Sequence, residues 1–312
     1  MICDKRIIVT GGAGFLGSHI VDKLKLNNQV FIPRRRDYDL TNADAVKQIF
    51  SDFNNVDIVI HAAADIGGIG YSSSHPGEQF YKNTLINLNV IHESYLANVK
   101  KFVGVGSVCE YPAVTPVPFK ECELWNGYPV VTNDAYGLTK RMMLAQCNAY
   151  NKQYGFSFIH LLPVNLYGPR DDFDINNSHV IPALIRKIVH AIDNDENYVN
   201  VWGTGFESRE FVYVEDAAEA VVLATEHYES TEPVNVGSGI EITIRELATL
   251  LKEILEYRGE FIYLNNGLGG QQRRMLDVSR AEKEFGFAAK TGFNDGLKKT
   301  VQYYLDNKDK LQ

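Results

Sequence analysis

Short apolar runs alternate with helical patterns through the first half of the chain. Runs with almost no polar positions are typical of parallel strands that are covered on both faces. Strands are predicted in RIIVT (6–10), QVFIP (29–33), VDIVIHA (56–62), KFVGVGS (101–107) and FSFIHLLPVN (156–165). Between them apolar residues recur at helical spacing, which predicts helices over 19–26, 84–97 and 136–154. This alternation predicts an α/β fold with a Rossmann-type, doubly wound parallel sheet.

The pattern changes after Pro169. It predicts a helix in VIPALIRKIVHAI (180–192), a strand and a helix in EFVYVEDAAEAVVLATEH (210–227), and a strand in PVNVG (233–237). Two further helical stretches indicate a smaller, mainly helical C-terminal lobe: IRELATLLKEILEYR (244–258) and AEKEFGF (281–287). We therefore expect one domain over 1–168, with returning segments at about 209–237, and a second lobe made of 169–208 and 238–312.

Composition narrows the class of protein. With 312 residues, of which 45% are hydrophobic and 22% charged, the chain can bury a sizeable core. Its net charge of −8 gives no reason to expect a nucleic-acid partner, and its apolar runs are far shorter than the ~20 residues of a membrane span. The four cysteines lack metal-site spacing, and the ten residues before the first glycine leave no room for a signal peptide. We expect a cytoplasmic protein with reduced thiols and no metal, and without nucleic-acid or membrane partners.

A glycine triplet lies between the first predicted strand and helix. Gly11, Gly14 and Gly17 occur in VTGGAGFLGSHIVDKL (9–24). Such glycines allow a tight turn, close approach of a diphosphate to backbone N–H groups, and close packing of the helix on its strand. An ordinary glycine-rich turn is the alternative, but the position between strand and helix favours a dinucleotide site in the first domain.

The end of the second predicted strand favours NADP over NAD. NAD sites usually carry an acidic residue there, which binds the ribose 2′-hydroxyl. This chain has Arg34, Arg35 and Arg36 instead, and guanidinium groups can bind a 2′-phosphate through paired hydrogen bonds. Asp37 and Asp39 lie just beyond, so NAD stays open, as does a solvated basic turn without a ligand.

Two segments supply candidate catalytic residues. Tyr136 and Lys140 are spaced i, i+4 in NDAYGLTKRMM (133–143) and therefore share a helix face. A lysine one turn away can stabilise the phenolate of a tyrosine, whose reference pKa is about 10. Ser107 and Cys109 end the fourth predicted strand, where residues two apart share a face, and Ser107 can donate to the same substrate oxygen. An exposed helical Tyr–Lys pair without a catalytic role is the alternative.

These segments resemble the extended short-chain dehydrogenase/reductase superfamily over essentially the full chain. Further support comes from HAAA (61–64), PVNLYGP (163–169), REFVYVEDAA (209–218) and LDVSRAEKEFGF (276–287). The resemblance implies that Ser107, Tyr136 and Lys140 assist hydride exchange at a sugar carbon, with a dinucleotide in the first domain and a nucleotide sugar in the second lobe. The implied cofactor-binding residues are Gly11, Gly14, Phe15, Leu16, Gly17, Arg34, Arg35, Arg36, Asp39, Leu40, Ala62, Ala63, Ala64, Tyr136, Lys140, Pro163, Asn165, Leu166 and His179.

A narrower resemblance is to the GDP-L-fucose synthases. It rests on AADIGGI (63–69), GSVCEYP (106–112), NLYGPRDDFDINNSHVIPALIRK (165–187) and VWGTGFESREFVYVED (201–216). The resemblance implies NADP-dependent epimerisation at carbons 3 and 5 and reduction at carbon 4 of a GDP-linked 4-keto-6-deoxy sugar, giving GDP-L-fucose. Cys109 would be the epimerising base and His179 the acid, while Ser107 serves the reduction. A homodimer formed through the helices 84–97 and 136–154 is also implied.

The residue types suit this chemistry. The carbonyl of a 4-keto sugar acidifies the hydrogens at carbons 3 and 5, and a thiolate favoured by nearby positive charge can remove them. A histidine can return a proton from the opposite face, because its pKa lies near working pH. Tyr136 and Ser107 would stabilise the enolate oxygen. For Cys109 and His179, a buried structural thiol and a loop histidine with a structural hydrogen bond are the alternatives.

Substrate contacts are implied by the same resemblance. Arg209 suits a diphosphate, and Trp202 can pack against the sugar or the base. Lys187 follows Arg186 where the family often has two arginines, and either can face the substrate or be a solvated charge. For Arg274 a salt bridge on the surface of the lobe is the alternative. The implied substrate-binding residues are Asn165, Val180, Arg186, Lys187, Trp202, Arg209 and Arg274.

Several positions depart from the family pattern. Val108 replaces a small polar residue, and Glu110 brings a carboxylate beside the thiol, although strand alternation predicts that it points away. LWNGYPVVTND (124–134) and NNGLGGQQRR (265–274) also differ, where substrate selectivity could be set. A nucleotide-sugar 4-reductase or 4-epimerase without 3,5-epimerase activity is therefore an alternative, and so is a non-catalytic dinucleotide-sensing protein.

Overall fold

The computed structural model describes residues 2–174, 177–264 and 271–311. Two parts of the motifs above, 175–176 and the glycine-rich 265–270, lie outside the described residues. In the described ranges, no helix has both the length and the apolar character needed to cross a membrane.

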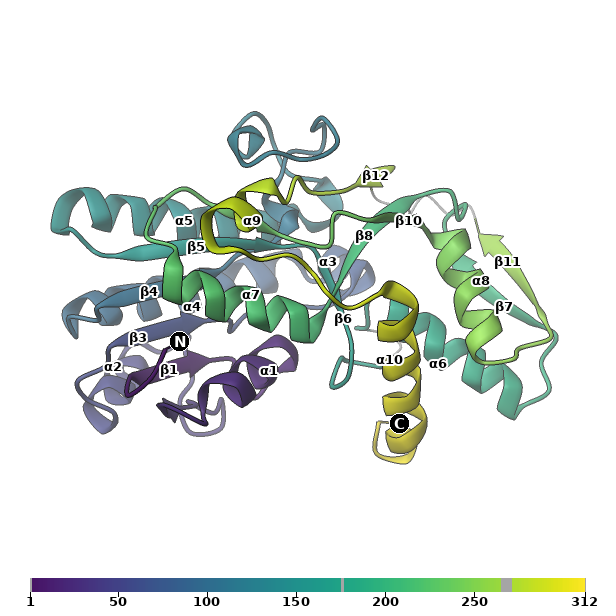
Figure 1. The fold of residues 1–312 in the computed structure, drawn as a ribbon, viewed down its shortest axis with the longest axis horizontal. Helices are drawn as coiled ribbons and strands as arrows, with labels where there is room; N and C mark the ends of the chain where they lie inside the picture. The colour runs from purple at the N-terminus through teal and green to yellow at the C-terminus, as the bar shows by residue number, and fades with distance from the viewer. Residues whose placement is uncertain (1, 175–176, 265–270, 312) are drawn as a thin grey trace.

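The first domain is built on a parallel sheet with the strand order β2-β1-β3-β4-β5-β9 (Figure 1). Its central strands are buried along nearly their whole length, which explains their continuous apolar sequence. The sheet grows in opposite directions from β1, so β1 and β3 flank the switch point where α/β folds bind ligands. The strands are β1 (Arg6–Thr10), β2 (Gln29–Phe31), β3 (Ile58–His61), β4 (Lys101–Val105), β5 (Phe158–Pro163) and β9 (Val234–Val236).

Two layers of helices cover this sheet. In one layer α4 packs against α2 and α5, and in the other α7 packs against α1 and α9 (Figure 1). This arrangement confirms the predicted Rossmann-type, doubly wound fold. The helices are α1 (Phe15–Leu24), α2 (Ala43–Asp52), α3 (Ile69–Ser74), α4 (Pro76–Leu96), α5 (Asp134–Tyr154), α7 (Val214–His227) and α9 (Ser279–Phe285).

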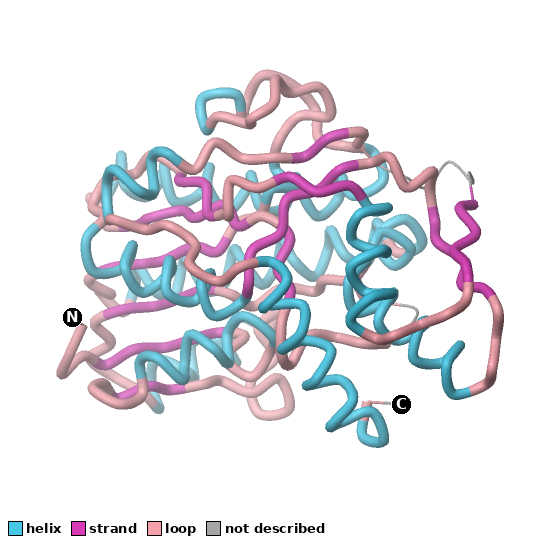
Figure 2. The backbone as a smooth tube through the Cα atoms, turned by 45° about the vertical axis from the view of Figure 1, so that its right-hand side comes forward, coloured by secondary structure: helices cyan, strands magenta, loops and turns pink. Residues whose placement is uncertain are grey.

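The second lobe combines helices with two small sheets, which Figure 2 shows at the side of the molecule away from the N-terminus. Its core is a separate apolar cluster that includes Ile185, Tyr213 and Leu247. The strands β7, β10, β11 and β12 were not predicted, because they are short and several of their positions are polar or exposed. The elements are α6 (Val180–Asp193), α8 (Ile244–Ile254), α10 (Phe293–Asn307), β6 (Asn165–Tyr167), β7 (Tyr198–Trp202), β8 (Ser208–Tyr213), β10 (Glu241–Thr243), β11 (Glu260–Leu264) and β12 (Arg273–Arg274).

Two strand predictions need correction. The run 156–165 is not one strand, because β5 ends at Pro163 and β6 pairs with β8 instead. Within the segment 209–237 that we expected to return to the first sheet, only β9 joins it, while β8 belongs to the second sheet with β6, β10 and β12. Like the buried strands of the first sheet, β8 is buried at nearly every position, so its pattern cannot distinguish the two sheets.

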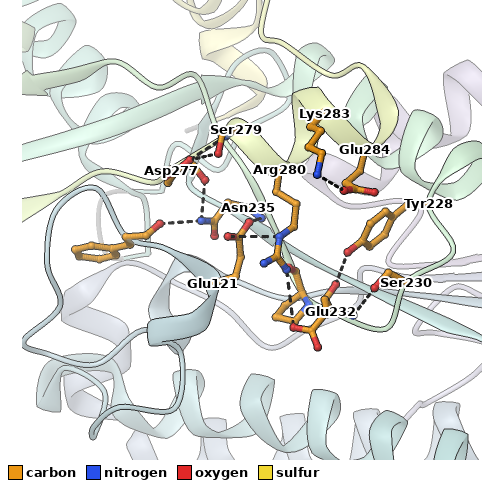
Figure 3. Close-up of polar contacts among 12 residues, drawn as sticks. Glu121, Tyr228, Ser230, Glu232, Asn235, Asp277, Ser279, Arg280, Lys283 and Glu284 are labelled. Carbon is orange, nitrogen blue, oxygen red and sulfur yellow. Dashed lines mark hydrogen bonds and ion pairs between the residues drawn. The ribbon is translucent and has the colours of Figure 1, made fainter.

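A buried polar cluster ties the edge of the first sheet to the segment that carries β12 (Figure 3). Asn235 on β9 is fully buried and donates to the carbonyls of Phe119 and Asp277 at 2.9 and 3.0 Å. Glu121 accepts the backbone N–H of Asn235 at 3.0 Å and faces Arg280 of α9. This cluster fixes the backbone directly after Arg274, since Phe119 N–H also donates to the Met275 carbonyl at 2.8 Å.

Candidate active site

The glycine turn has the geometry of an anion-binding cradle. Gly11 has φ +70°, and a Cβ there would lie 2.8 Å from the backbone nitrogen of Ala63. A Cβ on Gly17 would overlap the Gly11 carbonyl, so only glycine lets α1 approach β1 this closely. No side chain caps the N-terminus of α1 at Gly14, which leaves first-turn N–H groups for a ligand. This turn fits the diphosphate of a dinucleotide.

The arginine turn after β2 fits an additional phosphate. Arg34, Arg35 and Arg36 are exposed, and Arg36 pairs with Asp37 at 3.2 Å. The Asp39 carboxylate is held within its own turn by the backbone N–H and the hydroxyl of Thr41, and these hydrogen bonds lower the pKa of Asp39. Three arginines against two aspartates leave the turn with a net positive charge, which suits a 2′-phosphate.

Other expected cofactor residues lie along the same edge of the sheet. Each is half-buried, and most lie close to the carboxyl end of a strand of the first domain or at β6. Phe15 is in the first turn of α1, and Leu40 is in the loop between β2 and α2. They are Phe15, Leu40, Ala62, Ala63, Ala64, Pro163, Asn165 and Leu166. Leu16 differs, because it is buried in the core under α1.

Ser107 and Cys109 do not share a strand face, which corrects the sequence prediction. β4 ends at Val105, and Val108–Glu110 forms a 3₁₀ turn with Ser107 as its N-cap. The Ser107 hydroxyl accepts the Cys109 N–H at 3.1 Å, and the Glu110 carboxylate accepts the Ser107 N–H at 2.9 Å. This capping box satisfies orphan N–H groups that a strand would have paired, and it presents both side chains from one tight turn.

Tyr136 and Lys140 face this turn from α5, as predicted. Burial raises the pKa of Tyr136 strongly, with Cys109 and Glu110 adding to the effect, while a hydrogen bond with Ser107 opposes it. The Lys140 ammonium donates to the Val105 carbonyl at 2.7 Å and lies 5.7 Å from the centre of the Tyr136 ring. Burial lowers the pKa of Lys140 to about 8. The structure thus brings the serine, tyrosine and lysine together.

The Cys109 thiol lies between an amide and a guanidinium. The Asn133 side chain donates to Sγ at 3.0 Å, and Arg274 approaches Sγ at 3.8 Å. Arg274 on β12 pairs in register with Arg209 on β8. Burial lowers the pKa of Arg209 to about 10, and the charge of Arg274 contributes to that change. Two guanidiniums on neighbouring strands therefore face the thiol.

His179 belongs to the same neighbourhood. It caps the N-terminus of α6, and the segment before it is tied to the first domain because Gly68 N–H donates to the Asn177 carbonyl at 2.6 Å. The His179 side chain is exposed, yet the protein atoms packed around it lower its pKa through desolvation. Asp172 opposes this change and Arg274 adds to it, so Arg274 acts electrostatically on the imidazole and contacts the thiol.

The structure separates the two neighbouring cations of α6. Lys187 donates to the Asn200 carbonyl at 3.1 Å and lies 5.3 Å from the centre of the Trp202 ring. Arg186 instead donates to the Phe173 carbonyl at 2.9 Å, on the side of α6 that faces α10. Trp202 is half-exposed and is the nearest side chain to Gly70 of α3 in the first domain.

Two substrate candidates remain, Asn165 and Val180. The Asn165 amide donates to the Glu210 carbonyl at 2.9 Å, and Val180 is the half-buried first residue of α6. Lys187 and Trp202 are thus brought together, as are Arg209 and Arg274, whereas Arg186 is turned to another face.

Sequence reasoning missed two polar contributions. Asn133 precedes Tyr136 by three residues at the start of a helix, so its spacing could have placed it near the same site. His160 pairs with Glu110 beneath the turn, but a histidine in the apolar run of β5 gives no such signal. Glu110 does point away from the thiol, although the reason is the 3₁₀ turn rather than strand alternation.

Comparisons with known proteins agree with this geometry. Residues 7–237 match the NAD dependent epimerase/dehydratase family. The chain is 37% identical to a GDP-L-fucose synthase of Sinorhizobium fredii, over 97% of this chain and 96% of that one.

Two solved structures have nearly the same fold. A GDP-6-OMe-4-keto-L-xylo-heptose reductase from C. jejuni superposes with a TM-score of 0.91 at 28% identity, over 98% of this chain and 99% of that one. A GDP-L-fucose synthetase from Naegleria fowleri bound to NADP gives a TM-score of 0.90 at 28% identity, over 99% and 96%. The chain therefore belongs to the NAD dependent epimerase/dehydratase family.

Proposed function

We propose that this protein is an NADP-dependent enzyme that epimerises carbons 3 and 5 and reduces carbon 4 of a GDP-linked 4-keto-6-deoxy sugar, giving GDP-L-fucose. The observation that carries the proposal is the thiol of Cys109 beside Ser107 and Tyr136, with Arg274 linking it to His179. The similarity to a GDP-L-fucose synthase over nearly the whole chain supports the same substrate class.

Reduction would use the serine, tyrosine and lysine. Ser107 and Tyr136 can hold the ketone oxygen, and the raised pKa of Tyr136 keeps its hydroxyl protonated at neutral pH. Bound NADPH would supply the hydride. Tyr136 can then protonate the alkoxide oxygen to give the new hydroxyl, while Lys140, cationic below about pH 8, stabilises the phenolate left behind.

Epimerisation would use the thiol and the imidazole. Arg274 places positive charge beside the Cys109 sulfur, which can take the proton beside the ketone. The lowered pKa makes the His179 imidazolium a stronger acid than free histidine, so it gives a proton readily to the opposite face. Ser107 and Tyr136 would stabilise the enolate oxygen meanwhile.

Substrate binding would use the second lobe. The paired guanidiniums of Arg209 and Arg274 suit a diphosphate, and Trp202 with Lys187 offers an aromatic face and a charge for the sugar or base. Asn165 and Val180 stay candidate contacts, whereas Arg186 is the weaker one because it is turned toward Phe173.

A homodimer through α4 and α5 is part of this proposal. These helices pack on each other and carry exposed Tyr81, Leu88, Leu96 and Tyr154, which a second copy could cover. Light scattering of the purified protein tests this: a monomer at all concentrations would contradict it. The cytoplasmic location stays a prediction.

Turnover in D₂O tests the proposed activity. The protein is given GDP-4-keto-6-deoxy-D-mannose and NADPH, NADPH oxidation is followed by absorbance, and deuterium in the product is located by NMR. Deuterium at carbons 3 and 5 supports the proposal. Reduction without exchange would instead support a 4-reductase, as the similarity to a heptose reductase allows. No NADPH oxidation with any 4-keto nucleotide sugar would favour a non-catalytic dinucleotide-binding protein.

A matched variant separates the two reactions. Cys109→Ser should abolish the deuterium exchange. A serine hydroxyl does not ionise at neutral pH, so it supplies no base to remove the proton. The variant should still reduce a ketone that has already been epimerised, since Ser107, Tyr136 and Lys140 are intact. Equal loss of both activities would contradict the roles assigned to Cys109 and Ser107.

A further inference from the structure

A buried carboxylate–imidazole pair lies directly beneath the catalytic turn. Glu110 and His160 are both fully buried, and His160 Nε2 lies 3.0 and 3.1 Å from the two carboxylate oxygens. A carboxylate can only accept, so Nε2 carries the hydrogen and donates it. His160 Nδ1 has no hydrogen-bond partner among the residues described. Two apolar side chains would fill this space without the desolvation of a carboxylate. The buried pair therefore lowers the stability of the fold, which a role in the site would explain.

The pair holds the backbone of the turn. One carboxylate oxygen of Glu110 accepts both the Ser107 N–H and His160 Nε2. The Glu110 carbonyl accepts from the Arg141 side chain at 2.5 Å, which anchors the other end of the turn to α5. A Cβ at Gly106 would overlap both the Glu110 carboxylate and the His160 ring, so the glycine leaves the room that the pair occupies.

The pair also sets the charge beneath the site. Three titratable side chains of α5 face it, namely Tyr136, Lys140 and Arg141. Cys109 lies on its own turn, and the buried Tyr111 follows it, with a pKa that burial raises and the Glu110 charge raises further. His61 of β3 faces Lys140 from the neighbouring strand, and burial lowers its pKa to about 3. Burial lowers the pKa of Lys140, and the Glu110 charge opposes that change. Burial and Cys109 raise the pKa of Tyr136, and Glu110 raises it further.

We propose that Glu110, oriented by His160, is a positioning residue that fixes the Ser107–Cys109 turn and supplies the negative charge opposite Lys140. Glu110 is fully buried and bonded to the turn and to His160, so it is not placed to contact sugar or cofactor. This inference rests on the proposed function, because it assigns Glu110 to the machinery of that reaction. As a consequence, the protonation states of Tyr136 and Lys140 depend on the charge of Glu110.

Three variants separate geometry from charge. Glu110→Gln keeps an acceptor for the Ser107 N–H but removes the charge. Its kcat for reduction should fall about tenfold, and the basic limb of its pH profile should move about one pH unit lower, because Lys140 and Tyr136 both lose protons earlier. His160→Gln keeps the charge but loosens the carboxylate, so kcat should fall with little movement of the limb. The double variant can restore an amide–amide hydrogen bond, so its kcat should match that of Glu110→Gln rather than fall further, while the limb stays shifted.

Glu121→Gln is the matched control. Glu121 is also a buried carboxylate that accepts a backbone N–H and faces an arginine, but its partners are Asn235 and Arg280. This variant should lose stability in urea without moving the pH profile. An unchanged limb in Glu110→Gln, or losses of kcat that only follow the loss of stability in all four variants, would overturn the inference.

A second readout keeps the inference separate from the proposed substrate. If wild-type protein turns over no 4-keto sugar, the proposed function fails. The pH dependence of NADPH binding, followed by nucleotide fluorescence, still reports on Lys140 as an expected cofactor contact. The binding curve of Glu110→Gln should move to lower pH relative to wild type, and a curve that coincides with wild type would overturn the inference by itself.

Discussion

Replacing Lys140 with methionine should stabilise the protein while removing its activity. Lys140 is 2% exposed, and burial lowers its pKa from 10.5 to about 8. A difference of that size means that folding with a charged side chain costs about 3 kcal/mol. Methionine fills similar space without charge, but it leaves the Val105 carbonyl without its hydrogen bond, a loss of about 1–2 kcal/mol. The variant should therefore be more stable by about 1–2 kcal/mol at pH 7.

The pH dependence identifies the cause. At low pH Lys140 is protonated in both the folded and the unfolded protein. The full cost of burying its charge is therefore present below about pH 8. Between about 8 and 10.5 the folded lysine has lost its proton while the unfolded one keeps it, so the stability of wild type rises with pH. The advantage of Lys140→Met should therefore shrink by about 1.4 kcal/mol per pH unit and disappear near about pH 9. Toward the upper end of the window the variant should be the less stable protein, because only its missing hydrogen bond to the Val105 carbonyl remains.

Urea unfolding at several pH values between about 7 and 10 measures this difference. Lys47→Met, at an exposed position of α2, is the control and should change the free energy of unfolding by no more than about 0.5 kcal/mol. NADPH oxidation by Lys140→Met should fall at least about 100-fold. A stability difference between wild type and Lys140→Met that stays constant with pH would refute the reasoning.

Three further substitutions test other parts of the structure. Gly17→Ala should abolish NADPH binding in fluorescence titrations, because its Cβ would overlap the Gly11 carbonyl, whereas Gly77→Ala, with open space around it, should bind normally. Asn235→Ala should lower the free energy of unfolding in urea by about 2–4 kcal/mol, since it removes the three buried hydrogen bonds of the Asn235 side chain at the β9 edge. Trp202→Ala should raise KM for the sugar about tenfold without changing the affinity for NADPH, and a selective effect on NADPH would contradict its assignment to substrate.

The sequence predicted most of the first domain because its signals are local and repeated. A buried parallel strand must be apolar throughout, and the helices between strands must present one apolar stripe, so both patterns are visible without a fold. Membership of a sheet is a different matter. β8 is as buried as the strands of the first sheet, yet it pairs with β6, β10 and β12. The residues of β8 alone do not indicate which strands it pairs with. Pairing partners are decided by tertiary contacts that a single run does not encode.

The site shows the same division. Tyr136 and Lys140 are close in sequence on one helix, so their spacing was enough to place them together. Arg274 reaches Cys109 from the other lobe, and its place there depends on the pairing of β12 with β8 and on the buried cluster around Asn235. His160 meets Glu110 only because β5 lies beside β4. Contacts of this kind follow from the topology and could not be derived before it.

The 3₁₀ turn changes how the two proposed reactions relate to each other. On a strand, Ser107 and Cys109 would be independent side chains on one face. In the turn, the Ser107 hydroxyl accepts the Cys109 N–H. A shift of the Cys109 backbone therefore also moves the Ser107 side chain. A hydroxyl has only one hydrogen to donate, and the Ser107 hydroxyl is also hydrogen-bonded with Tyr136. A ketone oxygen that binds here must therefore accept from hydroxyl groups that are already hydrogen-bonded to each other. One rigid turn, held from below by Glu110, would thus align the base for the epimerisation and the donor for the reduction on the same carbonyl.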